Sequence, residues 1–235
     1  MLVAYTYIRR FAQLGSRDVA LVGGKNASLG EMVRELTVEG IRVPDGFATT
    51  AQAYYDFLTH AGLLESIRAN LARLDPRDIA QLEQVGAEIR RSIVHAELPL
   101  LLAEELAAAY RELEKQYGPE PDVAVRSSAT AEDLPEASFA GQHDSFLNIR
   151  GTADLLGTCR RVYASLFNDR AISYRASRGY DHMRVALSIG VQKMVRADLG
   201  ASGVMFTLDT ESGFRDVVFI NAAYGLGENV VKGAV

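Results

Sequence analysis

The sequence is poor in residues that support covalent crosslinks and thiol chemistry. Its 235 residues include one cysteine, Cys159, and no tryptophan. A single cysteine excludes an internal disulfide framework and is typical of proteins from a reducing cytoplasm. Because no activating histidine or other base can be placed beside Cys159, we interpret it as a small buried hydrophobic residue rather than a nucleophile.

Long apolar segments and an excess of positive charge are also missing. No window reaches the roughly 18 uninterrupted apolar residues of a membrane span, and the N-terminal residues lack the pattern of a signal peptide. The formal net charge of −5 argues against general nucleic-acid binding, which depends on a basic surface. We therefore expect a soluble, cytoplasmic protein with no nucleic-acid and no membrane partner.

Two well-known phosphate-binding fingerprints are incomplete in this chain. Gly23-Gly24-Lys25 is similar to the end of a P-loop, but GxxxxGK[ST] would need glycine at Val19 and a hydroxyl residue at Asn26. Residues 224–228 match only half of GxGxxG, whose third glycine would fall at Val230. On spacing alone, Lys25 is interpreted as a solvent-exposed lysine in a turn between a strand and a helix.

What the chain does contain is a long segment of small and polar residues between two apolar runs. Val123–Val125 and Phe146–Ile149 predict strands, and residues 126–142 predict a loop rich in Ser, Ala, Thr, Asp and Gly. Loops longer than ~12 residues inside a compact domain commonly bind ligands. Small residues let backbone N–H groups approach an anion, and Arg126 at the strand end adds a permanent charge. The segment therefore predicts a phosphate-binding site.

Hydrophobic periodicity predicts an α+β fold in which helices precede most strands. Short strands are predicted at Val3–Ile8 and Val19–Val22. Capping patterns place three helix starts, at Ser28, Thr49 and Asp75, and a further helical pattern runs from Pro99 to Tyr117. The apolar faces of the last three helices contain Tyr54, Phe57, Leu58, Ala61, Ile79, Leu82, Ile89, Ile93, Leu102, Leu106, Ala109 and Leu113.

The second half of the chain predicts two helices and then strands. The helices span Thr152–Leu166 and Asp169–Arg178, and the strands lie at Val185–Val195, Gly203–Leu208 and Val217–Ile220. We expect an N-terminal lobe at residues 1–183, with a helical scaffold and the loop 126–142. Residues 184–235 would begin an incomplete second lobe.

Several charged residues and histidines form no recognisable motif. We interpret the arginines of the two later helices as a solvated face; they are Arg160, Arg161, Arg170, Arg175 and Arg178. His60 and His95 are isolated and are assigned structural roles, His143 is a loop residue, and His182 is a surface residue. No spacing of metal ligands is present, so we assign no metal-binding residue within the chain.

Six segments, taken together, resemble one known family. They are VGGKNASLGEM (22–32), VPDGFATT (43–50), AVRSSATAEDLPEASFAGQ (124–142), SLFNDRAISYR (165–175), SGVMFTLDTESGF (202–214) and YGLGE (224–228). They are similar to the N-terminal ATP-binding domain of phosphoenolpyruvate synthases, in the PEP-utilising, pyruvate phosphate dikinase family. The resemblance extends from about Leu14 to the last residue.

The resemblance implies an ATP-grasp-like fold in which ATP lies between two α+β lobes. It implies that Lys25 and Arg126 are the catalytic cations on the ATP phosphates. It also implies that a loop closes over the phosphates through Ser127, Ser128, Thr130, Ser138, Ala140 and Gly141. The hinge strand against adenine would contain Gln192, Met194 and Val195, and Glu228 would lie near a cation.

In the full-length family enzyme, the resemblance implies that water takes the γ-phosphoryl group of ATP. The β-phosphoryl group passes through a histidine of a separate domain to pyruvate, giving phosphoenolpyruvate, AMP and phosphate. The Mg²⁺ ligands, the histidine domain and the pyruvate-binding barrel of the family would lie beyond Val235. We therefore expect a truncated domain, inactive alone, from a cytoplasmic enzyme of gluconeogenesis that is a candidate homodimer at full length.

Two alternative functions remain open from the sequence. A rifampicin phosphotransferase-like dikinase would use the same ATP-binding domain with another phosphoryl acceptor. A non-catalytic nucleotide-binding module would keep the fold without transferring a phosphoryl group. Titration of nucleotide against variants of Lys25 and Arg126 separates an ATP site from a chain that lacks one.

Overall fold

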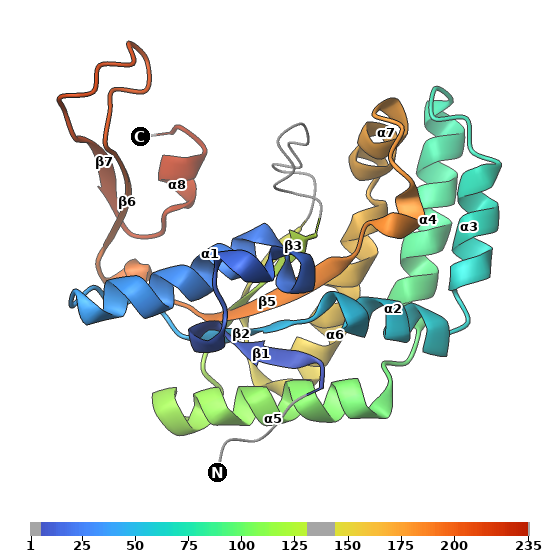
Figure 1. Cartoon of the computed structure of the whole chain (residues 1–235), viewed down its shortest axis with the longest axis horizontal. Coiled ribbons are helices and arrows are strands. Elements are labelled where there is room, and N and C mark those ends of the chain that lie inside the picture. Colours follow the sequence, from blue (N-terminus) through green and yellow to red (C-terminus); the bar gives the residue numbers. More distant parts are fainter. Residues whose placement is uncertain (1–5, 131–143, 235) are drawn as a thin grey trace. The chain divides into compact units, whose positions relative to one another are not determined.

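The computed structural model describes residues 6–130 and 144–234 (Figure 1). The chain divides into two compact units, Met1–Met194 and Val195–Val235. Both contain helices and antiparallel strands, as the α+β prediction requires. Within the described ranges, no helix combines the length and the apolar character needed to cross a bilayer.

An antiparallel sheet forms the centre of the first unit. Its strand order is β1-β2-β5-β3-β4. The strands span Ile8–Arg10 (β1), Gly46–Thr49 (β2), Leu187–Lys193 (β5), Val123–Ala129 (β3) and Ser145–Ile149 (β4). Since β5 lies between β2 and β3, segments that are far apart in the sequence become neighbours at the middle of the sheet.

Helices cover both sides of this sheet, with α1 and α5 on opposite sides in Figure 1. The helices are α1 (Val19–Val38), α2 (Ala51–His60), α3 (Leu64–Ala72), α4 (Ile79–His95), α5 (Leu100–Tyr117), α6 (Gly151–Ala164) and α7 (Asp169–Ser177). Short 3-10 turns occupy Phe11–Gln13, Ser16–Asp18, Ser165–Phe167 and His182–Arg184.

The first unit has two apolar cores because strand side chains alternate between faces. On one face, Val125 and Val191 pack in a large cluster with side chains of α2, α4, α5 and α6. On the other face, a smaller cluster that includes Phe11 and Val22 lies beneath α1. Cys159 of α6 is fully buried in the large cluster, which confirms its predicted role, and burial raises the pKa of its thiol to about 12.

The second unit is a smaller β-hairpin-like assembly. Strands β6 (Ala201–Phe206) and β7 (Phe219–Tyr224) pair antiparallel, and a 3-10 turn (Ala197–Leu199) and helix α8 (Glu228–Val231) complete the unit. The strands predicted for this part of the chain are thereby confirmed with small shifts of their ends. Many large apolar side chains of the unit are exposed, among them Ile220 and Tyr224.

The predicted beginning of α1 is wrong. Val19–Val22 form a helical turn rather than a strand, and α1 starts well before Ser28. The glycines that indicated a turn instead mark a break inside the helix, where Gly23 adopts φ 74° and ψ 161°. Glycine tolerates this left-handed backbone, so the helix changes direction there and resumes. Lys25 consequently lies in the first helical turn after the break.

Other helix starts differ from the predictions by a few residues. The cap of α2 is Thr50, whose hydroxyl accepts a hydrogen bond from the backbone N–H of Ala53 at 3.3 Å. The cap of α4 is Asp78 rather than Asp75, and it accepts from the N–H of Gln81 at 3.0 Å. Helix α3 was not predicted, whereas α5, α6 and α7 confirm the predicted helices.

The predicted solvent exposure of Arg175 is wrong, and His182, predicted at the surface, is partly buried. Arg175 is fully buried, where it donates to the carbonyl oxygen of Leu166 at 2.6 Å and to His182 Nδ1 at 3.0 Å. Burial lowers the pKa of Arg175 to about 10. Burial, with the nearby charge of Arg175, lowers the pKa of His182 to about 4, although Asp181 opposes this shift.

Strand β5 comes shortly after the lobe boundary predicted between residues 183 and 184. It is the central strand of the first unit, hydrogen-bonded to β2 on one side and to β3 on the other. The compact units divide after Met194 instead. The assignment of these units to the two lobes of an ATP-grasp-like domain stays a prediction.

Candidate functional site

A pocket of about 260 Å³ lies in the first unit where the start of α1 meets the middle of the sheet. Lys25 lines this pocket from α1, Arg126 from β3 and Gln192 from β5. Two predicted cations that are distant in the sequence therefore border one cavity. Ser127, also predicted as a site residue, contributes to the same lining.

One wall of the pocket is apolar. It is formed by Phe11, which is fully buried, and by Leu29 and Met32 of α1. Sequence reasoning did not identify these residues as parts of a site, because apolar residues on a helix are usually explained by packing. A pocket with a cationic end and an apolar wall can accept an anion attached to an apolar or flat group.

The strand register explains the position of Arg126. Arg126 pairs with Gly190, Ser128 pairs with Ser188, and Ala124 pairs with Gln192. Opposite residues of an antiparallel pair share a face, and the face alternates along each strand. Arg126 and Gln192 therefore project from the sheet on the same side, and Arg126 sits within β3 rather than at its end as predicted.

Gln192 holds the guanidinium group of Arg126 from the neighbouring strand. Arg126 Nη2 donates to Gln192 Oε1 at 3.4 Å, and Gln192 Nε2 donates to the carbonyl oxygen of Pro44 at 3.1 Å. The second bond fixes the amide so that its oxygen faces Arg126. Gln192 can therefore orient the guanidinium group of Arg126.

The pocket is electrostatically suited to an anion. The residues that the structure describes in its lining include Lys25 and Arg126 but no carboxylate. Surrounding protein lowers the pKa of Arg126, yet its side chain remains partly open to water and an arginine keeps its charge at neutral pH. The helix turn that carries Lys25 adds the positive end of a helix dipole.

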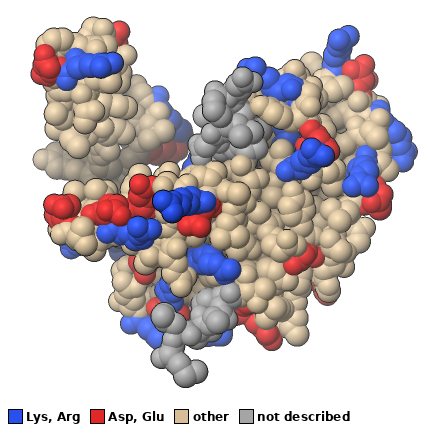
Figure 2. All heavy atoms as spheres, in the orientation of Figure 1, with Lys and Arg blue, Asp and Glu red and all other residues tan. Residues whose placement is uncertain are grey.

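This positive character is local. Figure 2 shows basic and acidic side chains interspersed over the visible face of the molecule, without an extended patch of one sign among the coloured residues. The negative net charge of the chain agrees with this distribution. Positive charge is thus gathered at a specific pocket rather than over the visible surface as a whole.

The same residues do not fit a magnesium ion. Mg²⁺ prefers carboxylate and phosphate oxygens, and the described lining supplies amide and hydroxyl oxygens beside two cations. Across the described residues, no cluster of three His, Cys, Asp or Glu side chains could hold a metal ion. The predicted Mg²⁺ cofactor stays a prediction.

Other predicted site residues lie outside the pocket lining. Ser128 is fully buried in β3, and Thr130 bonds to the backbone of Ala186 at the end of the strand. Glu228 belongs to the second unit, where it forms an ion pair with Lys232. The predicted residues Ser138, Ala140 and Gly141 fall outside the described part of the chain.

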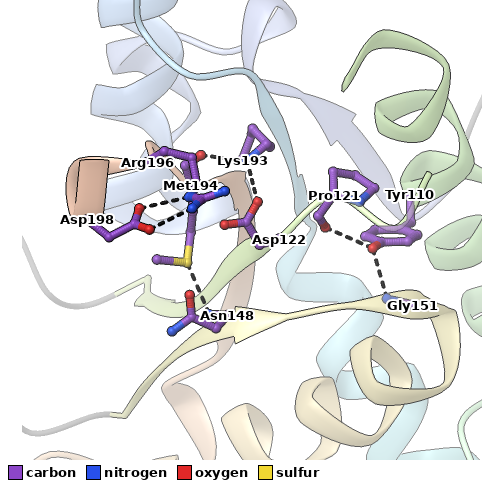
Figure 3. A network of polar contacts seen from close by, with 9 residues as sticks. All are labelled: Tyr110, Pro121, Asp122, Asn148, Gly151, Lys193, Met194, Arg196 and Asp198. Carbon is purple, nitrogen blue, oxygen red and sulfur yellow. Dashed lines mark hydrogen bonds and ion pairs between the residues drawn. The ribbon is translucent and has the colours of Figure 1, made fainter. Parts of the chain in front are cut away.

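The predicted hinge at the end of β5 is anchored to neighbouring segments (Figure 3). Lys193 Nζ contacts Asp122 Oδ1 at 2.5 Å, and the sulfur of Met194 accepts from the N–H of Asn148 at 3.0 Å. Burial raises the pKa of Asp122, but the bond and charge of Lys193 outweigh it, so the pKa is lowered overall. Val195 follows as an exposed residue of the second unit.

Comparison with known proteins assigns the chain to a family. The sequence profile described as pyruvate phosphate dikinase, AMP/ATP-binding domain matches residues 19–235. The chain belongs to this AMP/ATP-binding domain family. The family suggested by the sequence motifs is thereby confirmed.

Curated relatives of this AMP/ATP-binding domain include several phosphoenolpyruvate synthases. The chain is 58% identical to the phosphoenolpyruvate synthase of Neisseria meningitidis serogroup B. The match covers 234 residues, which is 99% of the chain and 30% of the relative. It is 58% identical to that of Pseudomonas aeruginosa over 97% of the chain and 29% of the relative. It is 54% identical to the phosphoenolpyruvate synthase of Escherichia coli K12, over 96% of the chain and 28% of the relative. The chain spans less than a third of the length of these relatives.

The AMP/ATP-binding domain contains further polar residues near the pocket that sequence reasoning missed. Asn26 lines the pocket, and Ser188 lies buried beneath it in β5. One signal could have pointed to them: polar or very small residues recur at every second position of β3 and β5, at Arg126, Ser128, Ser188 and Gly190. This alternation indicates a polar sheet face beneath a helix.

Proposed function

We propose that this chain is the ATP-binding part of a phosphoenolpyruvate synthase, and that ATP phosphates bind between Lys25 and Arg126. The observation that carries the proposal is that both cations line one pocket whose described lining has no carboxylate. The AMP/ATP-binding domain match and the identity to phosphoenolpyruvate synthases support the ligand. Paired cations favour polyphosphates because charge-assisted hydrogen bonds are strong and directional.

The finer assignments belong to the same proposal. ATP would lie in an ATP-grasp-like arrangement, with adenine toward Gln192, Met194 and Val195 and with loop residues closing over the phosphates. The closing residues would be Ser138, Ala140 and Gly141. Ser127 would instead contact the phosphates from β3, where it lines the pocket, and Ser128 and Thr130, also predicted from the resemblance, lie outside the pocket lining. Glu228 would lie near a cation. The apolar wall of Phe11, Leu29 and Met32 supports binding of a ligand that carries more than phosphate groups.

For the whole enzyme we propose conversion of ATP, pyruvate and water to phosphoenolpyruvate, AMP and phosphate. Phosphoryl transfer depends mainly on positioning and on neutralising charge, and Lys25 and Arg126 would supply part of both. A Mg²⁺ cofactor, a cytoplasmic location, a role in gluconeogenesis and a homodimeric full-length form are included as predictions. We expect the 235-residue chain alone to form no phosphoenolpyruvate.

Calorimetric titration tests the site directly. A non-hydrolysable ATP analogue is titrated into the chain with and without Mg²⁺, and then into Lys25→Ala and Arg126→Ala. Each substitution should raise Kd roughly 10- to 100-fold, because a hydrogen bond to a charged group contributes about 1.5–3 kcal/mol. A chain that binds no nucleotide, or two variants that bind as tightly as the parent, would refute the proposal.

Matched controls come from exposed cations on other helices. Lys115 and Arg68 have side-chain exposures of 73% and 61% and pair with glutamates on their own helices. Lys115→Ala and Arg68→Ala should leave Kd within about twofold, since exposed helix pairs contribute little. Phosphoenolpyruvate formed by the chain alone would contradict its expected inactivity without affecting the binding site.

A further inference from the structure

A group of polar side chains is buried directly beneath the broken start of α1. The exposed fractions of Asn26, Ser128, Ser188 and Thr49 are 2% or less. Burying polar atoms is costly unless they are hydrogen-bonded, so such a group requires a reason. The four residues come from α1, β3, β5 and β2, and the first three of these elements line the pocket.

Asn26 is the centre of this group. Its Nδ2 donates to Ser188 Oγ at 2.8 Å and to the carbonyl oxygen of Val22 at 3.1 Å. Its backbone N–H donates to Ser128 Oγ at 3.3 Å, and Ser188 Oγ donates onward to the carbonyl oxygen of Thr49 at 2.5 Å. Asn26 thus binds β5 through its side chain and β3 through its backbone.

Two glycines allow this close approach. A Cβ atom at Gly190 would lie 2.2 Å from Asn26 Oδ1, and a Cβ atom at Gly23 would lie 2.3 Å from Ser128 Oγ. Both distances are far below van der Waals contact, so any larger residue would push α1 away from the sheet. The start of α1 therefore has very little freedom to shift relative to β3 and β5.

We propose that Asn26 is a positioning residue for nucleotide binding. It holds the helix turn that carries Lys25 against the strand that carries Arg126. Lys25 directly precedes Asn26, and Ser128, the partner of the Asn26 N–H, lies two residues after Arg126. Like charges repel, so a fixed scaffold is needed to keep both cations at one pocket before an anion arrives.

This inference rests on the proposed function, because it requires that Lys25 and Arg126 bind the phosphates of ATP. A purely structural role for Asn26 would predict something different. Its loss would then lower stability and would change ATP affinity equally whether or not Lys25 is present. A positioning role predicts that its effect on affinity depends on Lys25, because the residue acts through that side chain.

A double-mutant cycle on ATP-analogue binding distinguishes the two roles. Asn26→Ala is measured in the parent chain and in the Lys25→Ala background. We expect a roughly tenfold rise in Kd in the parent and less than about a threefold rise in Lys25→Ala. The inference is overturned if Kd rises by the same factor in both backgrounds or does not rise in the parent.

A second variant tests the inference even if Asn26→Ala does not fold. Ser188→Ala removes the β5 acceptor of the Asn26 amide and leaves Asn26 and its bond to the carbonyl oxygen of Val22 in place. It should show the same dependence on Lys25 with a smaller effect, and circular dichroism confirms the folded fraction of each variant before titration. Equal effects of Ser188→Ala in both backgrounds would also overturn the inference.

A matched control uses a buried hydrogen-bond network away from the pocket. Tyr110 is fully buried, donates to the carbonyl oxygen of Pro121 at 2.9 Å and accepts from the N–H of Gly151 at 2.9 Å (Figure 3). Tyr110→Phe should lower Tm and leave Kd unchanged. If Tyr110→Phe weakens binding as much as Asn26→Ala, general destabilisation explains both and the inference fails.

The cycle also separates this inference from the proposed function. If Lys25→Ala binds the analogue as tightly as the parent, the proposed phosphate site is wrong and the inference falls with it. If Lys25→Ala weakens binding while Asn26→Ala acts independently of it, only the inference is wrong.

Discussion

Gly23 and Gly62 both adopt a left-handed backbone, with φ of 74° and 66°, but their surroundings differ. Apart from the adjacent residues, no heavy atom of the described part of the chain lies within 4 Å of a Cβ added at Gly62, whereas a Cβ at Gly23 would collide with Ser128. Gly62→Ala should cost about 1–2 kcal/mol from backbone strain alone. Gly23→Ala should cost more, because β3 or α1 must also move.

Chemical denaturation of the two variants measures this difference by linear extrapolation of the free energy of unfolding. The slope with denaturant should be unchanged in both, so that the midpoints compare directly. Equal losses of stability at the two positions would mean that the collision at Ser128 is relieved without cost.

The Arg175–His182 contact makes stability depend on pH. His182 Nδ1 can accept a hydrogen bond from Arg175 only while that nitrogen is unprotonated. The pKa of His182 is about 4 in the fold against an ordinary 6.5, so the unfolded chain binds more protons between these values. The contribution of His182 to the free energy of unfolding is therefore fully present above about pH 6.5 and is lost as pH decreases toward 4.

His182→Asn should keep an acceptor for Arg175 and remove this titration. The free energy of unfolding, measured from pH 7 to pH 4, should then fall less steeply than in the parent chain. His60→Asn is the control, because His60 is exposed at the end of α2 and should retain the slope of the parent. An unchanged slope in His182→Asn would show that His182 does not contribute.

At the scale of single helices, α4 shows that a periodic apolar pattern can include a residue that is not buried. Ile79 and Ile93 belong to the same predicted apolar face, but Ile93 is fully buried and Ile79 is 71% exposed at the first residue of α4. Ile93→Ala should destabilise the fold by about 2–5 kcal/mol, whereas Ile79→Ala should cost about 0.5 kcal/mol or less. Thermal unfolding of the two variants gives the comparison, and similar shifts of Tm would contradict this assignment of α4.

Helices with strong periodicity and clear ends could be predicted from the sequence. The helix from Pro99 ends as predicted at Gly118, which has φ 90°, and the four residues of its predicted apolar face are fully buried. The prediction of secondary structure failed where small residues are compatible with both a loop and a strand. Ser127 and Ser128 were assigned to a loop, but both belong to β3, because their small side chains fit between the sheet and the elements packed on it.

The candidate site could be predicted only in part, because local sequence segments identify some of its residues and long-range contacts determine the others. Lys25 and Arg126 lie in distinctive sequence segments, and the structure brings them to one pocket. Asn26 was not predicted, because its role depends on bonds to Ser128 and Ser188, which lie 102 and 162 residues further along the chain. Local patterns do not contain such long-range registers.

At the scale of the whole molecule, the two units should differ in stability. A two-stranded sheet is marginal by itself, and β6 and β7 expose large apolar side chains, including 66% of Met205 and 65% of Ile220. Amide hydrogens of β6 and β7 should therefore exchange much faster than those of β3 and β5. Hydrogen-exchange mass spectrometry measures both in one sample, and equal protection would contradict this order.

The burial of Cys159 has a practical consequence for work on this chain. It is the only cysteine, so the folded protein presents no reactive thiol, and alkylation can proceed only when α6 opens. The rate of alkylation then reports on opening without an added label. A cysteine introduced at the exposed Ser28, beside the pocket, would be the single accessible attachment point for a fluorophore that follows ligand entry.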